Sequence, residues 1–280
     1  MSRAPRNAKD YSQEDEAIAR FREDLKQRFP LPAPTPAKKK RTTAKALGVL
    51  LLAMAAGAAW VDPAYHAQHV ASQVGQRQAL QLADGSTVLL DSDSEMTVSW
   101  HLRTRQVTLT RGQALFDVAP MVYRPFLVDA GSAAVRVVGT RFNVNRLEQE
   151  VQVTVAEGKV AVRGGATDAL ALLEPGQQLR VRQGVPGPVT TVNADDVSAW
   201  KDSRLVFEST PLAEVIATLQ RYRRQPITLM EPNLARLPVS GVFDSNHVER
   251  LLALLPGILP LSVTTAPDGA VRINAHDRKK

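Results

Sequence analysis

The hydrophobic and polar positions of this chain follow four patterns in turn. Apolar residues recur with helical spacing over 12–29, an uncharged apolar run fills 46–61, apolar and polar positions alternate from about 75 to 192, and helix and strand patterns mix beyond 200. Spacings of three to four predict a helix, and alternation predicts strands. We therefore expect a mainly β protein with a single transmembrane helix, an all-β domain and a small α+β domain.

The first pattern predicts a helix with an unpartnered apolar face. Ser12 and Asp15 resemble a capping box, so the helix is expected to begin there and to end before Pro30. One short helix cannot bury its own stripe, so the stripe must lie on a partner protein, on a lipid surface or on a second copy. The stripe consists of Ile18, Phe21, Leu25 and Phe29.

The apolar run at 46–61 predicts a membrane anchor. Its 16 residues cover roughly 24 Å as a helix, against a hydrocarbon core of about 30 Å, so residues 42–45 and Trp60 must extend it. Lys38–Arg41 precede it after a proline-rich linker and place the amino end in the cytoplasm. A cleaved signal peptide and a buried core helix are the alternatives, although 45 preceding residues are long for a signal peptide.

The alternating region predicts an all-β domain over 70–192. Asp84-Gly85 between two apolar stretches is typical of a hairpin, and many short strands favour a sandwich, a barrel or a solenoid. Strands are expected at 79–82, 88–90, 96–100, 106–110, 114–118, 126–130, 133–138, 141–145, 151–156, 159–163 and 178–182.

The last region predicts a small α+β domain over 200–276. Its elements follow the order βαβ and then βαββ, which favours two helices on a mixed sheet. Strands are expected at 205–207, 227–229, 239–243, 261–265 and 271–273, and helices at 211–223 and 248–255.

The positive charge belongs to the amino-terminal segment. Residues 1–45 contain twelve Lys/Arg and six Asp/Glu, a net charge of +6, which leaves 23 and 22, a net of +1, for the rest. A nucleic-acid-binding domain would need a basic face on its folded part, so direct binding to nucleic acid is not expected. The absence of cysteine is compatible with a periplasmic location but excludes nothing.

A series of ordered motifs gives the chain a family resemblance. The motifs are Gly75-Gln76-Arg77, Leu82-Ala83-Asp84-Gly85-Ser86, Arg105-Gln106-Val107-Thr108-Leu109, Arg124-Pro125-Phe126-Leu127-Val128, Val138-Gly139-Thr140-Arg141-Phe142 and Val153 to Val160. With these motifs, the chain between residues 75 and 160 resembles the FecR family of transmembrane sigma-factor regulators. Residues 205–255 are similar to the short amino-terminal module of secretins and TonB-dependent receptors.

This resemblance implies a signal relay in the inner membrane. Residues 1–45 would hold an extracytoplasmic-function sigma factor through the apolar stripe, and the resemblance leaves open whether they inhibit the sigma factor, activate it, or do both in turn. The periplasmic part would contact the signalling domain of an outer-membrane TonB-dependent transducer for iron or siderophore uptake. From the residues themselves, Arg221, Tyr222 and Arg224 are a candidate interface, and the alternative is that the arginines only favour the carboxyl end of their helix. Envelope proteases would then release the cytoplasmic segment. Family members usually have a longer cytoplasmic helical domain than this chain.

Candidate chemistry is sparse. Some relatives resemble self-cleaving proteins at the bond equivalent to Gly139-Thr140, where a threonine hydroxyl attacks the preceding carbonyl; the alternative is a bend or bulge between two strands. His66 and His69 are interpreted as part of a solvated helix, and Asp91, Asp93 and Glu95 as a polar turn, not as metal ligands. We expect no catalytic residues for an external substrate, no cofactor and no metal.

Two other functions remain open. The chain could be an envelope scaffold whose β-domain binds a cell-wall polymer, or a self-processing protein in which Thr140 matters most. Capture of a sigma factor, binding to cell wall and fragment mapping distinguish the three.

Overall fold

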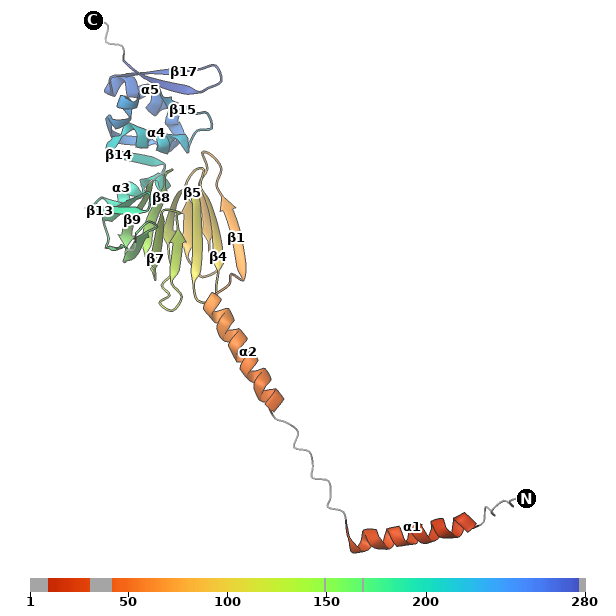
Figure 1. Ribbon diagram of the computed structural model, residues 1–280. Coiled ribbons are helices and arrows are strands. Elements are labelled where there is room, and N and C mark those ends of the chain that lie inside the picture. Colours follow the sequence, from red (N-terminus) through yellow and green to blue (C-terminus); the bar gives the residue numbers. More distant parts are fainter. Residues whose placement is uncertain (1–9, 31–41, 149, 168, 277–280) are drawn as a thin grey trace. The chain divides into compact units, whose positions relative to one another are not determined.

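The computed structural model describes residues 10–30, 42–148, 150–167 and 169–276 (Figure 1). The chain divides into two compact units, 1–54 and 55–280. Strands form the larger share of its regular structure, so the expected mainly β class is confirmed. The proline-rich basic linker falls almost entirely on 31–41, outside the described residues, and the predicted domain boundaries stay predictions.

Helix α1 (Asp10–Arg28) begins earlier than expected. Ser12 lies inside its first turn, so the prediction that the helix begins at Ser12 is wrong; acidic residues favour the amino end of a helix, and Asp10 extends this helix by two residues. The helix stops before Pro30, as predicted. Ion pairs between Glu16 and Arg20 and between Glu23 and Lys26, at 4.0 and 3.6 Å, lie along its surface.

Helix α2 (Thr42–Val61) contains the whole apolar run. None of the helices in the described part of the chain, however, is long and apolar enough to qualify as a membrane span. The expected anchor at 46–61 is therefore not confirmed.

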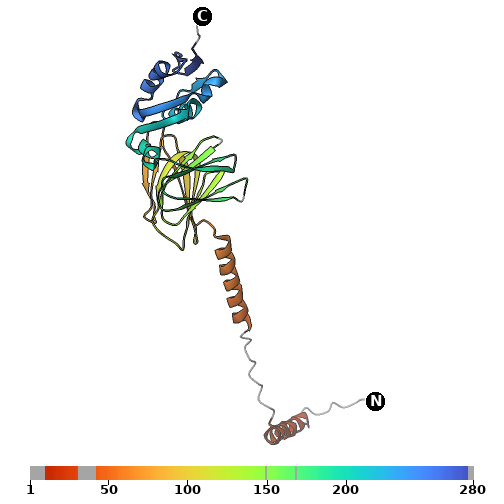
Figure 2. The same ribbon diagram turned by 90° about the vertical axis from the view of Figure 1, so that its left-hand side faces the viewer.

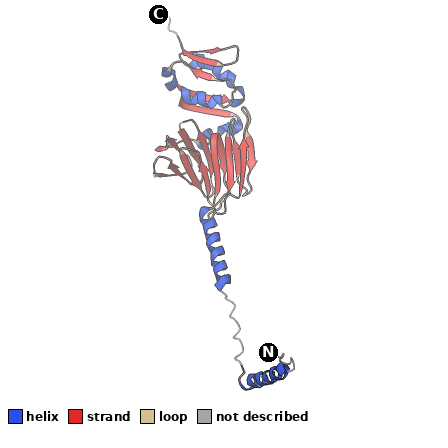
Figure 3. Cartoon of the chain, turned by 45° about the vertical axis from the view of Figure 1, so that its right-hand side comes forward, coloured by secondary structure: helices blue, strands red, loops and turns tan. Residues whose placement is uncertain are grey.

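The β-portion, residues 66–191, is one continuous hydrogen-bonded network folded into two layers (Figures 1 and 3). Its strands are β1 (His66–Ala71), β2 (Gln78–Gln81), β3 (Thr87–Leu90), β4 (Glu95–Trp100), β5 (Arg105–Asp117), β6 (Phe126–Asp129), β7 (Ala133–Val137), β8 (Arg141–Arg146), β9 (Glu150–Glu157), β10 (Val160–Gly164), β11 (Leu170–Leu173), β12 (Gln177–Arg182) and β13 (Val185–Thr191).

Strand β5 joins the two layers. Its first half pairs with β4 and β6, and its second half pairs with β3 and β8. Gly112, at φ 85°, lies where the strand passes from one layer to the other, and a Cβ there would lie 2.2 Å from the Ser94 hydroxyl oxygen. The strands expected at 106–110 and 114–118 are therefore one bent strand.

The edge strands β1, β11 and β13 were not predicted, because buried and exposed positions do not alternate along them. In β1 every residue except Val70 is exposed, and β13 contains Pro186 and Pro188, which sheets tolerate at edges. The solvated helix expected at His66 and His69 is wrong, since both lie on β1, which pairs with β4. Residues three apart on a strand point to opposite faces, so the two imidazoles do not converge.

Most of the aliphatic side chains and three phenylalanines fill the space between the layers. The rings of Phe116 and Phe142 stack at 5.0 Å, and Phe126 meets Phe116 edge to face at 6.0 Å. The same buried cluster includes Met96, Leu109 and 23 other described residues. This core gives the β-portion its two-layer form.

The terminal portion, residues 204–275, has the expected elements but not the expected single sheet (Figure 2). Strands β14 and β16 form one antiparallel pair, while β15, β18 and β17 form a second sheet in which β15 and β18 are parallel. Its elements are β14 (Arg204–Pro211), α4 (Leu212–Gln220), β15 (Ile227–Leu229), β16 (Pro238–Asp244), α5 (Val248–Ile258), β17 (Leu261–Thr265) and β18 (Val271–Ala275).

The core of the terminal portion includes one residue of the β-portion. Leu115 points outward from β5 and belongs to the same buried cluster as Trp200 of the connecting segment and Leu212, Leu219 and other residues of the terminal portion. Short helices α3 (Ala194–Val197) and η1 (Ala199–Asp202) connect the portions and contribute Trp200. Alternation along β5 thus sends Phe116 into one core and Leu115 into the other.

A buried ion pair fastens the β2–β3 turn to β5. The side chains of Arg105 and Asp84 are 0% and 2% exposed, and Arg105 Nη1 lies 2.6 Å from Asp84 Oδ2. Arg105 also donates to the carbonyls of Arg124 and Ala119 at 2.9 and 3.1 Å. Burial alone would raise the pKa of Asp84, but hydrogen bonds from Arg105 and Ser86 outweigh it and hold the pKa below its ordinary value.

We predict that Asp84→Asn destabilises the fold by about 3 to 5 kcal/mol, because it leaves a buried guanidinium without its counter-charge. The folded pKa of Asp84 is lowered, so its contribution is present above the unfolded pKa and is lost as the pH falls through the folded value. Urea unfolding at neutral pH and at about pH 3 measures both effects.

Glu157→Gln is the matched control, since the Arg141–Glu157 pair at 3.2 Å is exposed and should change stability by at most about 1 kcal/mol. Equal effects of the two substitutions would contradict the assigned role of the buried pair.

Candidate functional site

The apolar stripe of α1 is uncovered in its own compact unit. Ile18, Phe21, Leu25 and Phe29 are between 47% and 72% exposed. Phe29 follows the last helical residue, and its amide still donates to the Leu25 carbonyl at 2.9 Å. The four side chains therefore remain available to bind something outside the described chain, which is the property that the sequence predicts for them.

The Gly139-Thr140 bond lies in the bend between β7 and β8, where the chain passes from one layer to the other. Thr140 is 5% exposed, and its hydroxyl is buried without a hydrogen-bond partner among the described residues. Its carbonyl accepts a 2.9 Å bond from the Val118 amide. The structure thus contains the expected bend and, in addition, a buried hydroxyl that the fold leaves unpaired.

Two glycines let this bend pack closely. A Cβ on Gly139 would lie 2.7 Å from the Pro120 Cα, and a Cβ on Gly158, at φ 82°, would lie 2.6 Å from the Thr140 Cγ2. Both approaches are too short for any larger residue without movement. Glycine at these positions therefore has a packing role, whether or not the bond is chemically reactive.

Arg221 and Tyr222 point toward the β-portion and do not form an exposed cluster. The Tyr222 hydroxyl lies 2.7 and 2.8 Å from the two carboxylate oxygens of Asp91, and Arg221 Nη1 donates to the Asn145 side chain at 2.9 Å. The Ser92 hydroxyl donates to the Arg221 carbonyl. Of the three predicted interface residues only Arg224 is exposed, so the other two serve the contact between the portions.

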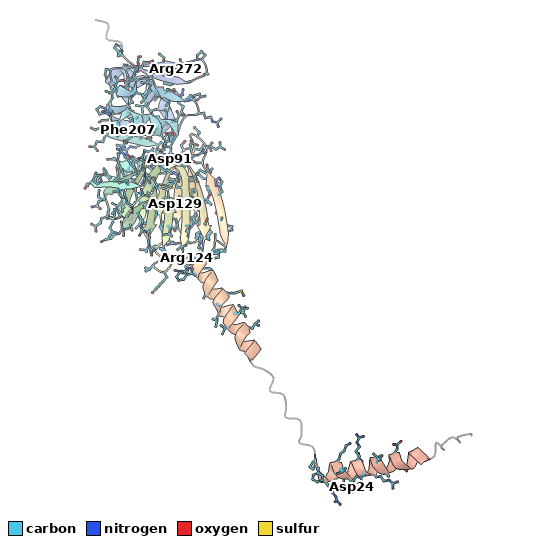
Figure 4. All side chains as sticks on the ribbon, viewed as in Figure 1. Asp24, Asp91, Arg124, Asp129, Phe207 and Arg272 are labelled. Carbon is cyan, nitrogen blue, oxygen red and sulfur yellow. The ribbon has the colours of Figure 1, made fainter. Side chains whose placement is uncertain are left out.

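Asp91 is the polar centre of this contact (Figure 4). Its side chain is completely buried. Burial raises the pKa of Asp91 despite the nearby Arg221 charge and the Tyr222 hydrogen bond. Burial and the negative charge of Asp91 also raise the pKa of Tyr222, so the phenol stays protonated and donates the bond.

Besides the Asp91–Tyr222 hydrogen bonds, Arg77 links the β-portion to the connecting segment, a contact that the sequence did not predict. Its Nη1 donates to the carbonyls of Trp200 and Lys201 at 2.7 and 2.6 Å, and its Nη2 donates to the Ser203 hydroxyl. A third fastening is the ion pair between Arg180 and Glu214 at 3.0 Å. All three span more than thirty residues of sequence, and no local pattern signals such partners.

A polar cavity of about 240 Å³ lies beside these contacts. It is lined by side-chain amides from neighbouring strands of one layer and by residues of β14 and α4. Its lining includes Gln113, Asn143, Asn145, Gln152, Gln178, Arg180, Trp200, Glu214 and Arg221. Within the described chain no three His, Asp or Glu side chains are grouped as metal ligands would be.

Comparison with known proteins identifies the β-portion. Residues 68–161 match the family described as FecR protein. The chain carries a FecR domain. This match confirms the family resemblance. It runs from within β1 to within β10 and includes Asp91 and Thr140, which lie in the connections between strands.

Solved structures extend the likeness beyond the FecR domain. Two crystal structures of a proposed anti-sigma factor from Parabacteroides distasonis ATCC 8503 resemble the chain, one at 25% identity with a TM-score of 0.68 and the other at 26% identity with a TM-score of 0.67. They cover 75% and 74% of this chain and 99% and 98% of their own. No curated protein sequence matches the chain.

We predict that Tyr222→Phe lowers the stability of the FecR-domain protein by about 1 to 3 kcal/mol, because the buried Asp91 carboxylate loses a donor. Urea unfolding monitored by tryptophan fluorescence measures this loss. Tyr123→Phe is the matched control, since Tyr123 is 98% exposed. Unchanged stability of Tyr222→Phe would show that the bond does not hold the portions together.

Proposed function

We propose that this protein is a single-pass inner-membrane relay that controls an extracytoplasmic-function sigma factor. The observation that carries the proposal is the FecR match at 68–161 together with the likeness to a proposed anti-sigma factor over three quarters of the chain. Both support regulation of a sigma factor in general.

The sigma factor is proposed to bind the apolar stripe of α1. A helix with three large apolar residues exposed within its own bounds gains stability only when something covers them. An amphipathic helix recognised in a groove uses anchors at such spacings, and Ile18, Phe21 and Leu25 have them. The tail would hold the sigma factor as an anti-sigma factor and also deliver it as an activator.

Residues 46–61 are proposed to anchor the protein in the inner membrane. The supporting observations are a helix that contains the entire run and the basic cluster that precedes it. The helix begins at Thr42, four residues before the apolar run, and these residues would lengthen the proposed span. The amino terminus would then lie in the cytoplasm and both the FecR domain and the terminal portion in the periplasm.

The terminal portion is proposed to contact the signalling domain of an outer-membrane TonB-dependent transducer that is loaded with an iron carrier. Strands β14 and β16 pair only with each other in the described residues, so each has an edge available for strand addition. Arg224 is the exposed member of the predicted interface set. Envelope proteases would act after this contact and free the cytoplasmic segment with its sigma factor.

We predict that Phe21→Asp with Leu25→Asp in the full-length protein abolishes capture of a sigma factor from host membranes solubilised in detergent. Each buried anchor contributes about 2 kcal/mol, so the loss of both anchors weakens binding by several hundredfold, on the order of a thousandfold. Mass spectrometry of the captured proteins measures the loss.

The matched control is Ala19→Asp with Gln27→Asp, which adds the same number of acidic residues to α1 away from the stripe. Capture that survives the first pair, or that both pairs abolish equally, would refute the stripe as the interface. If no sigma factor is captured by the wild-type protein while cell-wall material is, the envelope scaffold becomes the better interpretation.

We also propose self-cleavage between Gly139 and Thr140, which is favoured by the unpaired hydroxyl of Thr140. The Thr140 oxygen would attack the Gly139 carbonyl carbon, the amide bond would break as its nitrogen takes the hydroxyl proton, and water would hydrolyse the resulting ester. Water is the second reactant, and the products are fragments 1–139 and 140–280.

We predict that the wild-type protein yields both fragments, that Thr140→Ala leaves the chain intact and that Thr140→Ser still cleaves, because serine keeps the hydroxyl. Intact mass spectrometry of freshly purified protein checks this. Thr110→Ala, which removes an exposed hydroxyl from β5, is the control. A chain that stays intact in every variant would leave the bend with a structural role alone.

A further inference from the structure

The chain leaves α2 through a turn that is fastened to the FecR domain. Asp62 follows Val61, the last helical residue, and has φ 46°, a left-handed conformation that aspartate tolerates better than most residues. Its carboxylate accepts hydrogen bonds from the Arg103 amide at 2.9 Å and from the Thr104 hydroxyl at 3.0 Å. The Asp62 carbonyl also contacts the His101 ring. The helix exit and the β4–β5 turn are thus joined directly.

A second loop belongs to the same structure. The Arg124 guanidinium donates to the Tyr65 hydroxyl at 2.9 Å and to the His101 carbonyl, and it lies 5.7 Å from the centre of the Trp100 ring. The residue that follows the loop also joins it to the turn, because the Arg105 amide donates to the Pro125 carbonyl at 3.0 Å. Segments 62–65, 101–104 and 119–125 therefore form one surface, which we call the tip.

The tip exposes apolar and aromatic side chains that the fold leaves uncovered. Tyr65, Leu102, Val122 and Tyr123 are 62%, 64%, 72% and 98% exposed. Arginines at 103 and 124 accompany them, and the only carboxylate within the three segments belongs to Asp62. Tyrosine, leucine and arginine side by side are the combination found where proteins meet lipid headgroups.

We propose that the tip docks on the lipid headgroups of the membrane in which residues 46–61 are anchored. The proposal rests on the anchor of the proposed function. If Val61 ends the span, Asp62 lies at headgroup depth, and the Arg103 amide is only 2.9 Å from it. Leu102 and Arg103 then lie at that depth whatever the tilt of the helix. Continuity with the anchor and positive charge toward anionic lipid both identify the occupant as lipid.

Docking gives the FecR domain a fixed orientation on the membrane. An anchor of one helix leaves an attached domain free to swing about its connection, whereas three segments on the headgroups remove that freedom. Figure 4 shows Arg124 in the tip and Arg272 in the terminal portion at opposite ends of the unit 55–280. The terminal portion is thereby directed away from the lipid surface.

The test uses the full-length protein in vesicles of phosphatidylethanolamine and phosphatidylglycerol. The chain has no cysteine, so Leu102→Cys, Tyr123→Cys, Met54→Cys and Leu254→Cys each accept a single environment-sensitive nitrobenzoxadiazole label. A doxyl group carried on the lipid then quenches only labels that reach the bilayer. Leu254, on α5, is 56% exposed and serves as the control for an exposed site in the terminal portion.

The expected result is strong quenching at 54, quenching at 102 and 123 that approaches it, and none at 254. If the label at position 54 is quenched while the labels at 102 and 123 are as little quenched as the label at 254, the docking is overturned and the anchor stands. No quenching at any position would overturn the anchor, and the docking with it.

Discussion

A guanidinium inside a folded domain must be paired, because an uncompensated buried charge costs several kcal/mol. Arg105 meets this constraint with Asp84 from the β2–β3 turn, with two carbonyls of the loop before β6, and with the ring of Phe126 at 5.4 Å. Two segments distant in sequence, the β2–β3 turn and residues 119–126, are therefore tied to the start of β5. Since β5 is also the strand shared by the two layers, the pairing stabilises the strand on which both layers depend.

Strand β5 also helps to hold the terminal portion in place. Its outward Leu115 enters the core of the terminal portion, and the turn after β3, whose register β5 sets, presents Asp91 to Tyr222. Polar bonds, an ion pair and shared apolar packing act together there. A structural change in one portion is therefore expected to alter the contacts of the other. A protein whose proposed task is to pass a signal along its length requires such a connection.

Patterns local in sequence predicted most of the strands and both helices of the terminal portion, because alternation and turn chemistry act over a few residues. They failed where burial does not alternate, as in exposed β1. They also divided β5 into two strands, because the bend at Gly112 reads locally as a turn. Arg221 and Tyr222 end a helix in the sequence, but their roles depend on Asn145 and Asp91, far away in the chain. The stripe of α1 was predictable because only its own spacing defines it.

The order of strands around the Gly139-Thr140 bend has a mechanical consequence. Strand β7, before the bend, pairs with β10 after it, and β8, after the bend, pairs with β5 before it. A chain cut at this bond would therefore consist of two interleaved pieces that stay together without a covalent link. Hydrogen bonds between the strands would hold the two fragments together against thermal motion. A steady force on one end would separate the strands one after another. The fragments would therefore dissociate under force and not at the moment of cleavage.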